Sequence, residues 1–245
     1  MPTPNPLRRR TLRAAAAMSA LGGSALAAGC ANPAAVPAPP GTEPIAPPLL
    51  RVGDQWRYRL TNRYNRSTIG ETTVQVLAAS PEIRLRLDPG GGAAPFEERY
   101  ADAWSVLVDA SFDAPMVFES AVPLVPAGLR ASSGRRTTTR YRSERASQPL
   151  AWEQRLDAIG WERVQVPAGT FDALRIERNI RLEHPDFFKL GGERNETLWY
   201  APQVGRWIAR EWTGSYMPGS PTPRSGRARE DWVRWELTAW QPAAR

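Results

Sequence analysis

Cysteine, histidine and lysine are nearly missing from this sequence of 245 residues, which holds one of each: Cys30, His184 and Lys189. A single cysteine cannot form a disulfide within the chain, so a disulfide framework is excluded. The usual zinc and iron–sulfur sites need several Cys or His ligands, and a Cys–His nucleophile needs both residues close together. A Ser-His-Asp triad would have to use His184, which we interpret as an ordinary surface residue of a loop. We therefore expect no metal and no organic cofactor.

The chain also lacks a large excess of basic over acidic residues once residues 1–29 are left out. The chain has 32 basic and 25 acidic residues, but residues 1–29 contain no acid. The basic residues of that segment are Arg8, Arg9, Arg10 and Arg13. The rest of the chain keeps 28 basic residues against 25 acidic ones, whereas a nucleic-acid-binding domain should keep a concentrated basic surface. We therefore expect no nucleic-acid partner, and we interpret the arginine-rich stretch 130–145 as the polar face of a strand hairpin rather than a site for anionic lipid head groups.

The first thirty residues have the three parts of an export signal. A basic segment is followed by the uncharged run Ala14–Ala28, and small residues then precede Cys30. The uncharged run has 15 residues, fewer than the roughly 20 that a membrane-spanning helix needs. This favours a signal that is removed over a permanent anchor. The segment Arg8–Arg13 also resembles a twin-arginine export motif, and general export is an equal alternative.

The junction Leu26–Cys30 resembles the bacterial lipobox. In proteins with that motif, the leader is cleaved just before the Cys, whose sulfur receives two acyl chains such as palmitate. The resemblance implies that residues 1–29 are a lipoprotein signal peptide and that Cys30 is lipidated, which attaches the protein stably to a bacterial membrane. Because Ala31 rather than Asp follows the Cys, the resemblance further implies the outer membrane, with the protein facing the periplasm. The alternative is a conventional signal that leaves a free thiol.

Residues 30–49 combine this Cys with a proline-rich segment. Its seven prolines are Pro33, Pro37, Pro39, Pro40, Pro44, Pro47 and Pro48. Proline fixes φ and removes a backbone donor, so the segment favours extended polyproline II. At about 3.1 Å per residue, residues 31–49 could reach up to roughly 60 Å, which predicts a semi-rigid tether. A strap that packs on the following domain near Leu49 and Leu50 is the alternative.

From residue 50 onward the hydrophobic period is two, as in strands. Ile83, Leu85 and Leu87 share one face of a strand, and residues 231–240 behave in the same way. Further strands are expected at 55–62, 70–78, 103–109, 136–143, 151–157, 161–166, 171–182, 195–201 and 205–213. We therefore predict a mainly β fold, in which residues 50–245 form a single curved antiparallel sheet, a half-barrel or a barrel, with little helix outside the signal peptide.

Two motifs in this region resemble a known pattern. Residues 166–176 contain Pro-Ala-Gly-Thr-Phe, and residues 198–205 contain Trp-Tyr-Ala-Pro-Gln-Val-Gly. They resemble a recurring element of uncharacterised bacterial envelope proteins, in which an antiparallel sheet carries a "PAGTF" turn and a "WYxPxVG" hairpin; residues 53–58 also fit. Some relatives of that kind are similar to periplasmic lipoprotein-carrier proteins, whose curved sheet wraps a lipid-binding hollow. The resemblance covers about half of the mature chain, implies a fold and assigns no catalytic residue.

Aromatic residues are the strongest feature of the domain, which contains all ten tryptophans. The favoured interpretation is that they fill a wide β core, and the alternative is that some line a hydrophobic cavity. On the second interpretation Trp199, Tyr200, Trp207 and Trp235 are the candidate ligand-binding residues. Replacement of Trp199 or Trp207 would then weaken ligand retention more than folding.

Phe187 and Phe188 lie next to each other in an expected loop. They could cap the core, which we favour, or form an exposed hydrophobic tip.

Catalysis would have to rely on carboxylates. The closest pairs are Glu97/Glu98, Asp109/Asp113 and Glu230/Asp231. A glycosidase needs two carboxyl groups that face one cleft, but adjacent strand residues point to opposite faces. Neither a nucleophile elbow nor a phosphate loop is present in the sequence, and we expect no catalytic residue.

The sequence therefore predicts a lipid-anchored, non-enzymatic protein of the bacterial cell envelope that binds a hydrophobic or amphipathic molecule. A structural or assembly accessory that docks on another envelope protein is the first alternative. A carboxylate-dependent glycan hydrolase is the second.

Overall fold

The computed structural model describes residues 47–112, 114–126, 134–219 and 226–244. All of them belong to one compact unit, Ala35–Arg245. The predicted signal peptide, Cys30 and most of the predicted tether lie outside the described residues, so these three assignments stay predictions.

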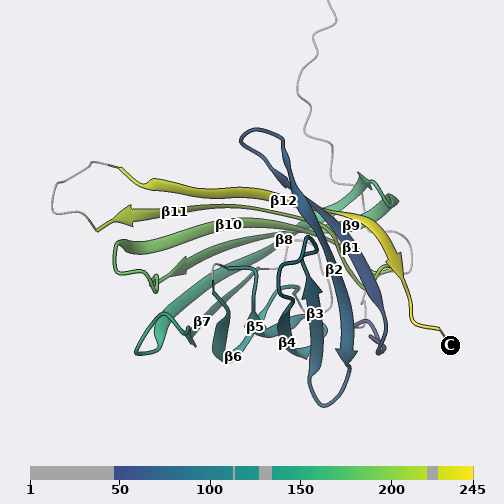
Figure 1. The fold of residues 1–245 in the computed structure, drawn as a ribbon, viewed down its shortest axis with the longest axis horizontal. Helices are drawn as coiled ribbons and strands as arrows, with labels where there is room; N and C mark the ends of the chain where they lie inside the picture. The colour runs from purple at the N-terminus through teal and green to yellow at the C-terminus, as the bar shows by residue number, and fades with distance from the viewer. Residues whose placement is uncertain (1–46, 113, 127–133, 220–225, 245) are drawn as a thin grey trace, which may run out of the picture. The chain divides into compact units, whose positions relative to one another are not determined.

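The described residues form a closed barrel of antiparallel strands without a helix (Figure 1). The strands are β1 (Gln55–Asn62), β2 (Thr68–Ala78), β3 (Ile83–Asp88), β4 (Phe96–Asp102), β5 (Ser105–Asp109), β6 (Met116–Pro123), β7 (Gly134–Arg142), β8 (Leu150–Val166), β9 (Gly169–Leu182), β10 (Lys189–Ala201), β11 (Arg206–Pro218) and β12 (Ala228–Gln241). Each strand pairs with its neighbours in sequence, and β12 pairs with β1 to close the barrel. The prediction of a mainly β fold with one curved antiparallel sheet is confirmed.

Side chains alternate between the interior and solvent along the strands. On β3, Ile83, Leu85 and Leu87 are buried, whereas Arg84 and Arg86 are exposed. An apolar interior and a charged outer face follow directly from this period of two. The arginines of β7 also follow the predicted pattern, since they are exposed.

Several parts of the sheet differ from the sequence prediction. The expected strands 151–157 and 161–166 are one strand, β8, whose pairing with β9 shifts between Ala158 and Gly160. Such an irregularity interrupts the hydrophobic period without ending the strand. Strands β4 and β6 and the first half of β10 were not predicted. In β4 and β10 the inward positions include Glu98 and Arg194 instead of apolar residues.

One end of the barrel, called here the turn end, carries the tight turn between β10 and β11. Gly205 in this turn has a φ of +70°, a conformation that L side chains rarely adopt. A Cβ atom at Gly205 would also lie 3.3 Å from Cβ of Pro48. Next to this turn, Leu50 packs against the core, whereas Leu49 is exposed. The last residues before the domain therefore pack on the turn end, as in the strap alternative, while the rest of the tether lies outside the described residues.

The interior near the turn end is filled by side chains. Trp104 and Tyr200 meet edge to face with ring centroids 6.0 Å apart, and Trp56 donates a hydrogen bond from Nε1 to the Val204 carbonyl at 3.0 Å. The free volume beside Trp207 is about 10 Å³, room for one water molecule at most. The cavity beside Trp207 is therefore too small for a lipid.

Replacement of a core residue should test the inward register. Leu156 on β8 is fully buried, whereas Ile159 on the same strand is 43% exposed. We expect Leu156→Ala to lower the free energy of unfolding by about 2 to 5 kcal/mol, because a cavity remains in the core. Ile159→Ala should change it by about 0.5 kcal/mol. Urea unfolding of both variants measures this, and losses of equal size would refute the assigned register.

Candidate ligand-binding site

The residues predicted to bind a ligand do not form one site. Trp199 lies on the outer side of the sheet, where its Nε1 donates to Glu162 Oε2 at 2.9 Å and its ring lies 4.9 Å from the Arg234 guanidinium. Tyr200, Trp207 and Trp235, in contrast, are buried. Their burial is what packing of the core requires.

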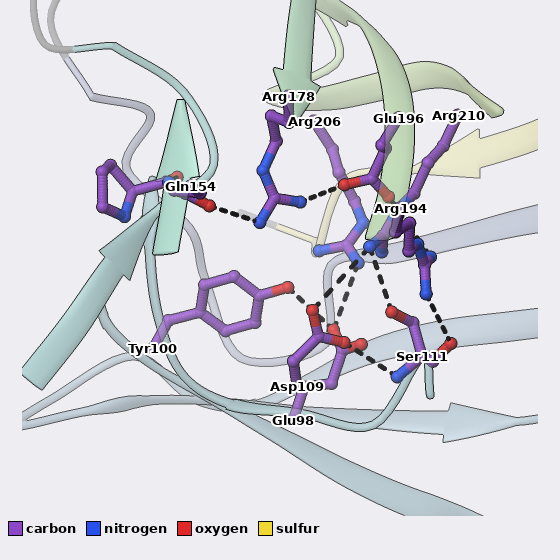
Figure 2. Close-up of polar contacts among 11 residues, drawn as sticks. Glu98, Tyr100, Asp109, Ser111, Gln154, Arg178, Arg194, Glu196, Arg206 and Arg210 are labelled. Carbon is purple, nitrogen blue, oxygen red and sulfur yellow. Dashed lines mark hydrogen bonds and ion pairs between the residues drawn. The ribbon is translucent and has the colours of Figure 1, made fainter. Parts of the chain in front are cut away.

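A cluster of buried charges lies in the barrel interior, and sequence reasoning did not identify it. Its members come from five strands: Glu98 on β4, Asp109 on β5, Arg178 on β9, Arg194 and Glu196 on β10, and Arg206 and Arg210 on β11. Figure 2 shows these side chains converging from strands that are far apart in the sequence. We call this group the charge cluster. Because unpaired buried charge is costly, each member needs partners.

Glu196 is the centre of the charge cluster. Its Oε2 accepts a hydrogen bond from Arg178 Nη1, and its Oε1 accepts one from Arg210 Nε. Arg194 Nη2 lies 3.4 Å from the same Oε1. Burial alone would raise the pKa of Glu196, but the charges of the three arginines outweigh it and lower the pKa to about 2. The carboxylate therefore stays ionised inside the protein.

The other glutamate of the charge cluster behaves in the opposite way. Burial and the nearby charge of Asp109 raise the pKa of Glu98, although Arg206 and Arg210 act against the shift. Glu98 Oε2 accepts a hydrogen bond from the Tyr100 hydroxyl at 2.7 Å and lies 3.6 Å from Arg206 Nη2. Glu98 thus holds its negative charge less firmly than Glu196 does.

Arg194 lies where the charge cluster meets an open pocket. Its guanidinium carbon is 4.2 Å from the ring centroids of both Phe112 and Trp212, so the planar group is held between two aromatic faces. Nη1 donates a long hydrogen bond of 3.4 Å to the Ser111 carbonyl, and the buried Nε has no hydrogen-bond partner among the described residues. Burial lowers the pKa of Arg194 to about 10, which still leaves it charged at neutral pH.

The pocket above Arg194, called here the mouth pocket, opens at the end of the barrel opposite to the turn end. It has a volume of about 360 Å³. Phe112, Arg194 and Trp212 line its inner part, and His184, Lys189 and Glu230 belong to its outer part. The mouth pocket therefore joins apolar walls with a buried cation, the usual composition of a small-molecule site.

The histidine and the serine of the mouth pocket each contact other residues. His184 Nδ1 accepts the backbone N–H of Asp186 at 3.0 Å, and Nε2 lies 3.8 Å from Glu230 Oε1. The Ser111 hydroxyl accepts a hydrogen bond from Arg210 Nη2 at 3.0 Å. None of these contacts joins the serine to the histidine as a nucleophilic pair requires.

The carboxylate pairs are placed as follows. Glu97 forms an ion pair with Arg84 at 2.7 Å on the outer face, whereas Glu98 is buried, as strand alternation predicts. Glu230 and Asp231 both line the mouth pocket. The pair Asp109/Asp113 cannot be judged, because residue 113 lies outside the described residues.

Phe187 and Phe188 do not cap the core. They are 81% and 69% exposed, and their rings contact each other with centroids 5.7 Å apart. The favoured prediction of core capping is therefore wrong. Together with the exposed Leu190 and Met217, which are paired in register on β10 and β11, they form what we call the apolar rim beside the mouth pocket.

The described ranges contain neither a membrane-spanning helix nor a group of side chains that could hold a metal. The described residues contain no helix that is long and apolar enough to cross a membrane. Nor do their His, Cys, Asp and Glu side chains include a group of three or more that could hold a metal ion.

Known proteins resemble this chain in fold alone. No family model and no curated protein matches the sequence. The fold resembles that of a candidate lipoprotein from Parabacteroides distasonis, with 13% identity and a TM-score of 0.47 over 78% of this chain and 96% of that one. It also resembles a candidate exported protein with a YmcC-like fold from Bacteroides fragilis, with 12% identity and a TM-score of 0.49 over 78% and 97%. Likenesses this weak assign neither a family nor a function, and the resemblance to lipoprotein-carrier proteins stays a prediction.

The two buried glutamates should respond differently to neutralisation. The lowered pKa of Glu196 means that its ionised form stabilises the fold, by about 3 kcal/mol at neutral pH. This stabilisation is complete above the ordinary pKa of 4.5 and is lost as the pH falls toward about 2. The raised pKa of Glu98 means that ionisation of Glu98 destabilises the fold, because burial favours its neutral form.

We therefore expect Glu196→Gln to lower the free energy of unfolding by about 3 to 5 kcal/mol at pH 7, since three buried arginines lose their shared anion. Glu98→Gln should change it by about 1 kcal/mol or less, because Gln imitates the neutral acid. Denaturant unfolding at pH 7 compares the two, with Glu97→Gln as the exposed control. Equal losses for both buried glutamates would contradict the assignment of charge.

Proposed function

We propose that the protein is a lipid-anchored, non-enzymatic component of the bacterial cell envelope that binds an amphipathic molecule in the mouth pocket. The export signal and the lipobox-like junction at Cys30 support the location. The outer membrane, with the barrel in the periplasm, is the site that Ala31 favours.

The mouth pocket is the observation that carries the binding function. Its volume of about 360 Å³ lies within the range of roughly 300 to 1,000 Å³ that ligand sites occupy. It offers aromatic walls from Phe112 and Trp212, a buried cation at Arg194, and an apolar rim outside. A molecule with both a polar and an apolar part matches this distribution.

The proposal moves ligand contact away from the aromatic residues that the sequence suggested. Tyr200 and Trp207 lie toward the filled turn end, and Trp199 lies on the outer side of the sheet. Trp235 stands behind the mouth pocket, with its ring centroid 6.1 Å from that of Trp212. In this proposal these residues support the barrel, and Trp212 touches the ligand.

The two ends of the barrel have different roles in the proposal. The chain enters the domain at the turn end, where Leu50 packs. The mouth pocket opens at the opposite end, so it faces away from the point where the predicted tether joins the barrel. A tethered barrel of this kind presents its pocket to the periplasm.

A docking role is the second candidate, and the apolar rim favours it. Exposed aromatic residues such as Phe187 and Phe188 are typical of surfaces that contact a partner. Photocrosslinking from position 188 in intact cells separates the two functions. A single dominant protein adduct would support an assembly accessory, whereas a ligand-binding protein should give none.

The binding function can be tested with residues 47–245, secreted without the lipid anchor and purified without detergent. This segment keeps every described strand. We expect native mass spectrometry and organic extraction to show one amphipathic molecule per protein. Ala114→Leu should reduce the bound amount about tenfold, because Ala114 lines the mouth pocket and the larger side chain fills it.

Ala239→Leu is the matched control, since Ala239 is exposed on β12. Thermal unfolding of each variant verifies that it is folded. A wild type without any bound molecule, or equal retention by Ala114→Leu and the wild type, would refute binding in the mouth pocket.

A further inference from the structure

We infer that the mouth pocket selects single-chain amphiphiles with an anionic head group, a carboxylate or a phosphate monoester, which Arg194 binds while the apolar chain leaves along the apolar rim. This inference rests on the proposed function, because it names the ligand class of the same site.

The balance of buried charge is the first reason. Within the part of the chain that the structure describes, the charge cluster contains four arginines but only three carboxyl groups. Glu98 is also the carboxyl group that holds its charge least firmly. A buried positive charge without a counter-ion is costly, so an anion that enters beside the cluster would be stabilised there.

The geometry of Arg194 is the second reason. A guanidinium has five N–H donors in a fixed plane, and the hydrogen bonds of Arg194 to Ser111 and Glu196 are both 3.4 Å long. The Nε–H is buried without a partner among the described residues. Because Phe112 and Trp212 hold the plane from both sides, the remaining donors are prearranged for an anion with two oxygens.

The acidic residues of the mouth pocket do not cancel this cation. They are Glu193, Glu230 and Asp231, which lie in its outer part. Glu230 forms an ion pair with Lys189 at 2.9 Å, and Glu193 lies 3.6 Å from Arg227. Asp231 shares the outer part with Arg229. Glu230 and Glu193 thus each lie near another cation, whereas Arg194 is the buried cation of the mouth pocket.

The apolar rim gives the chain of the ligand a place to lie. Phe187 and Phe188 directly follow Pro185 and Asp186 in the loop whose first residues line the mouth pocket. The backbone N–H of Gly219 donates to the Phe188 carbonyl at 2.8 Å, which joins this loop to the end of β11. An apolar chain that leaves the pocket therefore meets exposed apolar side chains instead of the charged outer face of the barrel.

Matched twelve-carbon probes test the inference by isothermal titration of residues 47–245, kept below the micelle concentration of each probe. We expect dodecanoate and dodecyl phosphate to bind at least about tenfold more tightly than dodecan-1-ol. Acetate and inorganic phosphate, which have the head group without the chain, should bind at least about tenfold more weakly than the matching amphiphiles. Arg194→Gln should remove the preference for the charged probes but keep binding of dodecan-1-ol. Arg86→Gln is the arginine control, because Arg86 is exposed on β3 and does not line the mouth pocket.

If Arg194→Gln does not fold, a measurement on the wild-type protein still tests the inference. The indole N–H resonance of Trp212, assigned by its loss in Trp212→Phe, should shift with dodecanoate, whereas that of Trp56 at the turn end should not. Equal affinity for dodecanoate and dodecan-1-ol would refute the anion preference and leave the proposed function intact. If no twelve-carbon probe binds at all, the proposed function itself fails. Tight binding of inorganic phosphate would refute the claim that the ligand is an amphiphile and would leave only an anion site.

Discussion

The interaction on which the interior depends is the one between Glu196 and three arginines. One carboxylate on β10 binds Arg178 on β9 and Arg210 on β11, and it lies within 3.4 Å of Arg194 on its own strand. Three like charges in a space of low polarity repel one another unless an anion lies between them. The position of Glu196 therefore fixes three neighbouring strands around a single point and determines where the remaining positive charge lies.

This arrangement divides the barrel into two halves with different properties. On the side of the turn end, aromatic side chains fill the interior, and Trp56 fastens the turn that closes it. On the other side, Arg194 belongs to the charge cluster and also lines the mouth pocket. The closed half supplies stability, and the open half supplies the surface on which our functional proposal depends. Of the aromatic residues that the sequence suggested as ligand contacts, Tyr200 and Trp207 belong to the first half.

The fold class could be predicted from the sequence, because apolar residues such as Ile83 and Leu85 alternate cleanly with charged ones. The charge cluster could not, because the alternation fails where inward residues are charged, as at Glu98 on β4. One signal was available: Arg178 lies between Ile176 and Ile180 on β9, in phase with buried residues. Its partner on β10 and the contact between Glu98 and Arg206, however, exist only after the strands have paired and the barrel has closed. Sequence patterns describe one strand at a time and carry no information on such contacts.

A crystal structure of residues 47–245 with dodecyl phosphate would test the central claim most directly. We predict phosphate oxygens within hydrogen-bond distance of Arg194 Nε or its terminal nitrogens, between Phe112 and Trp212, with the alkyl chain directed toward Phe187 and Phe188. A chain buried beside Trp207 at the turn end, or a mouth pocket that stays empty at saturating ligand, would contradict the account.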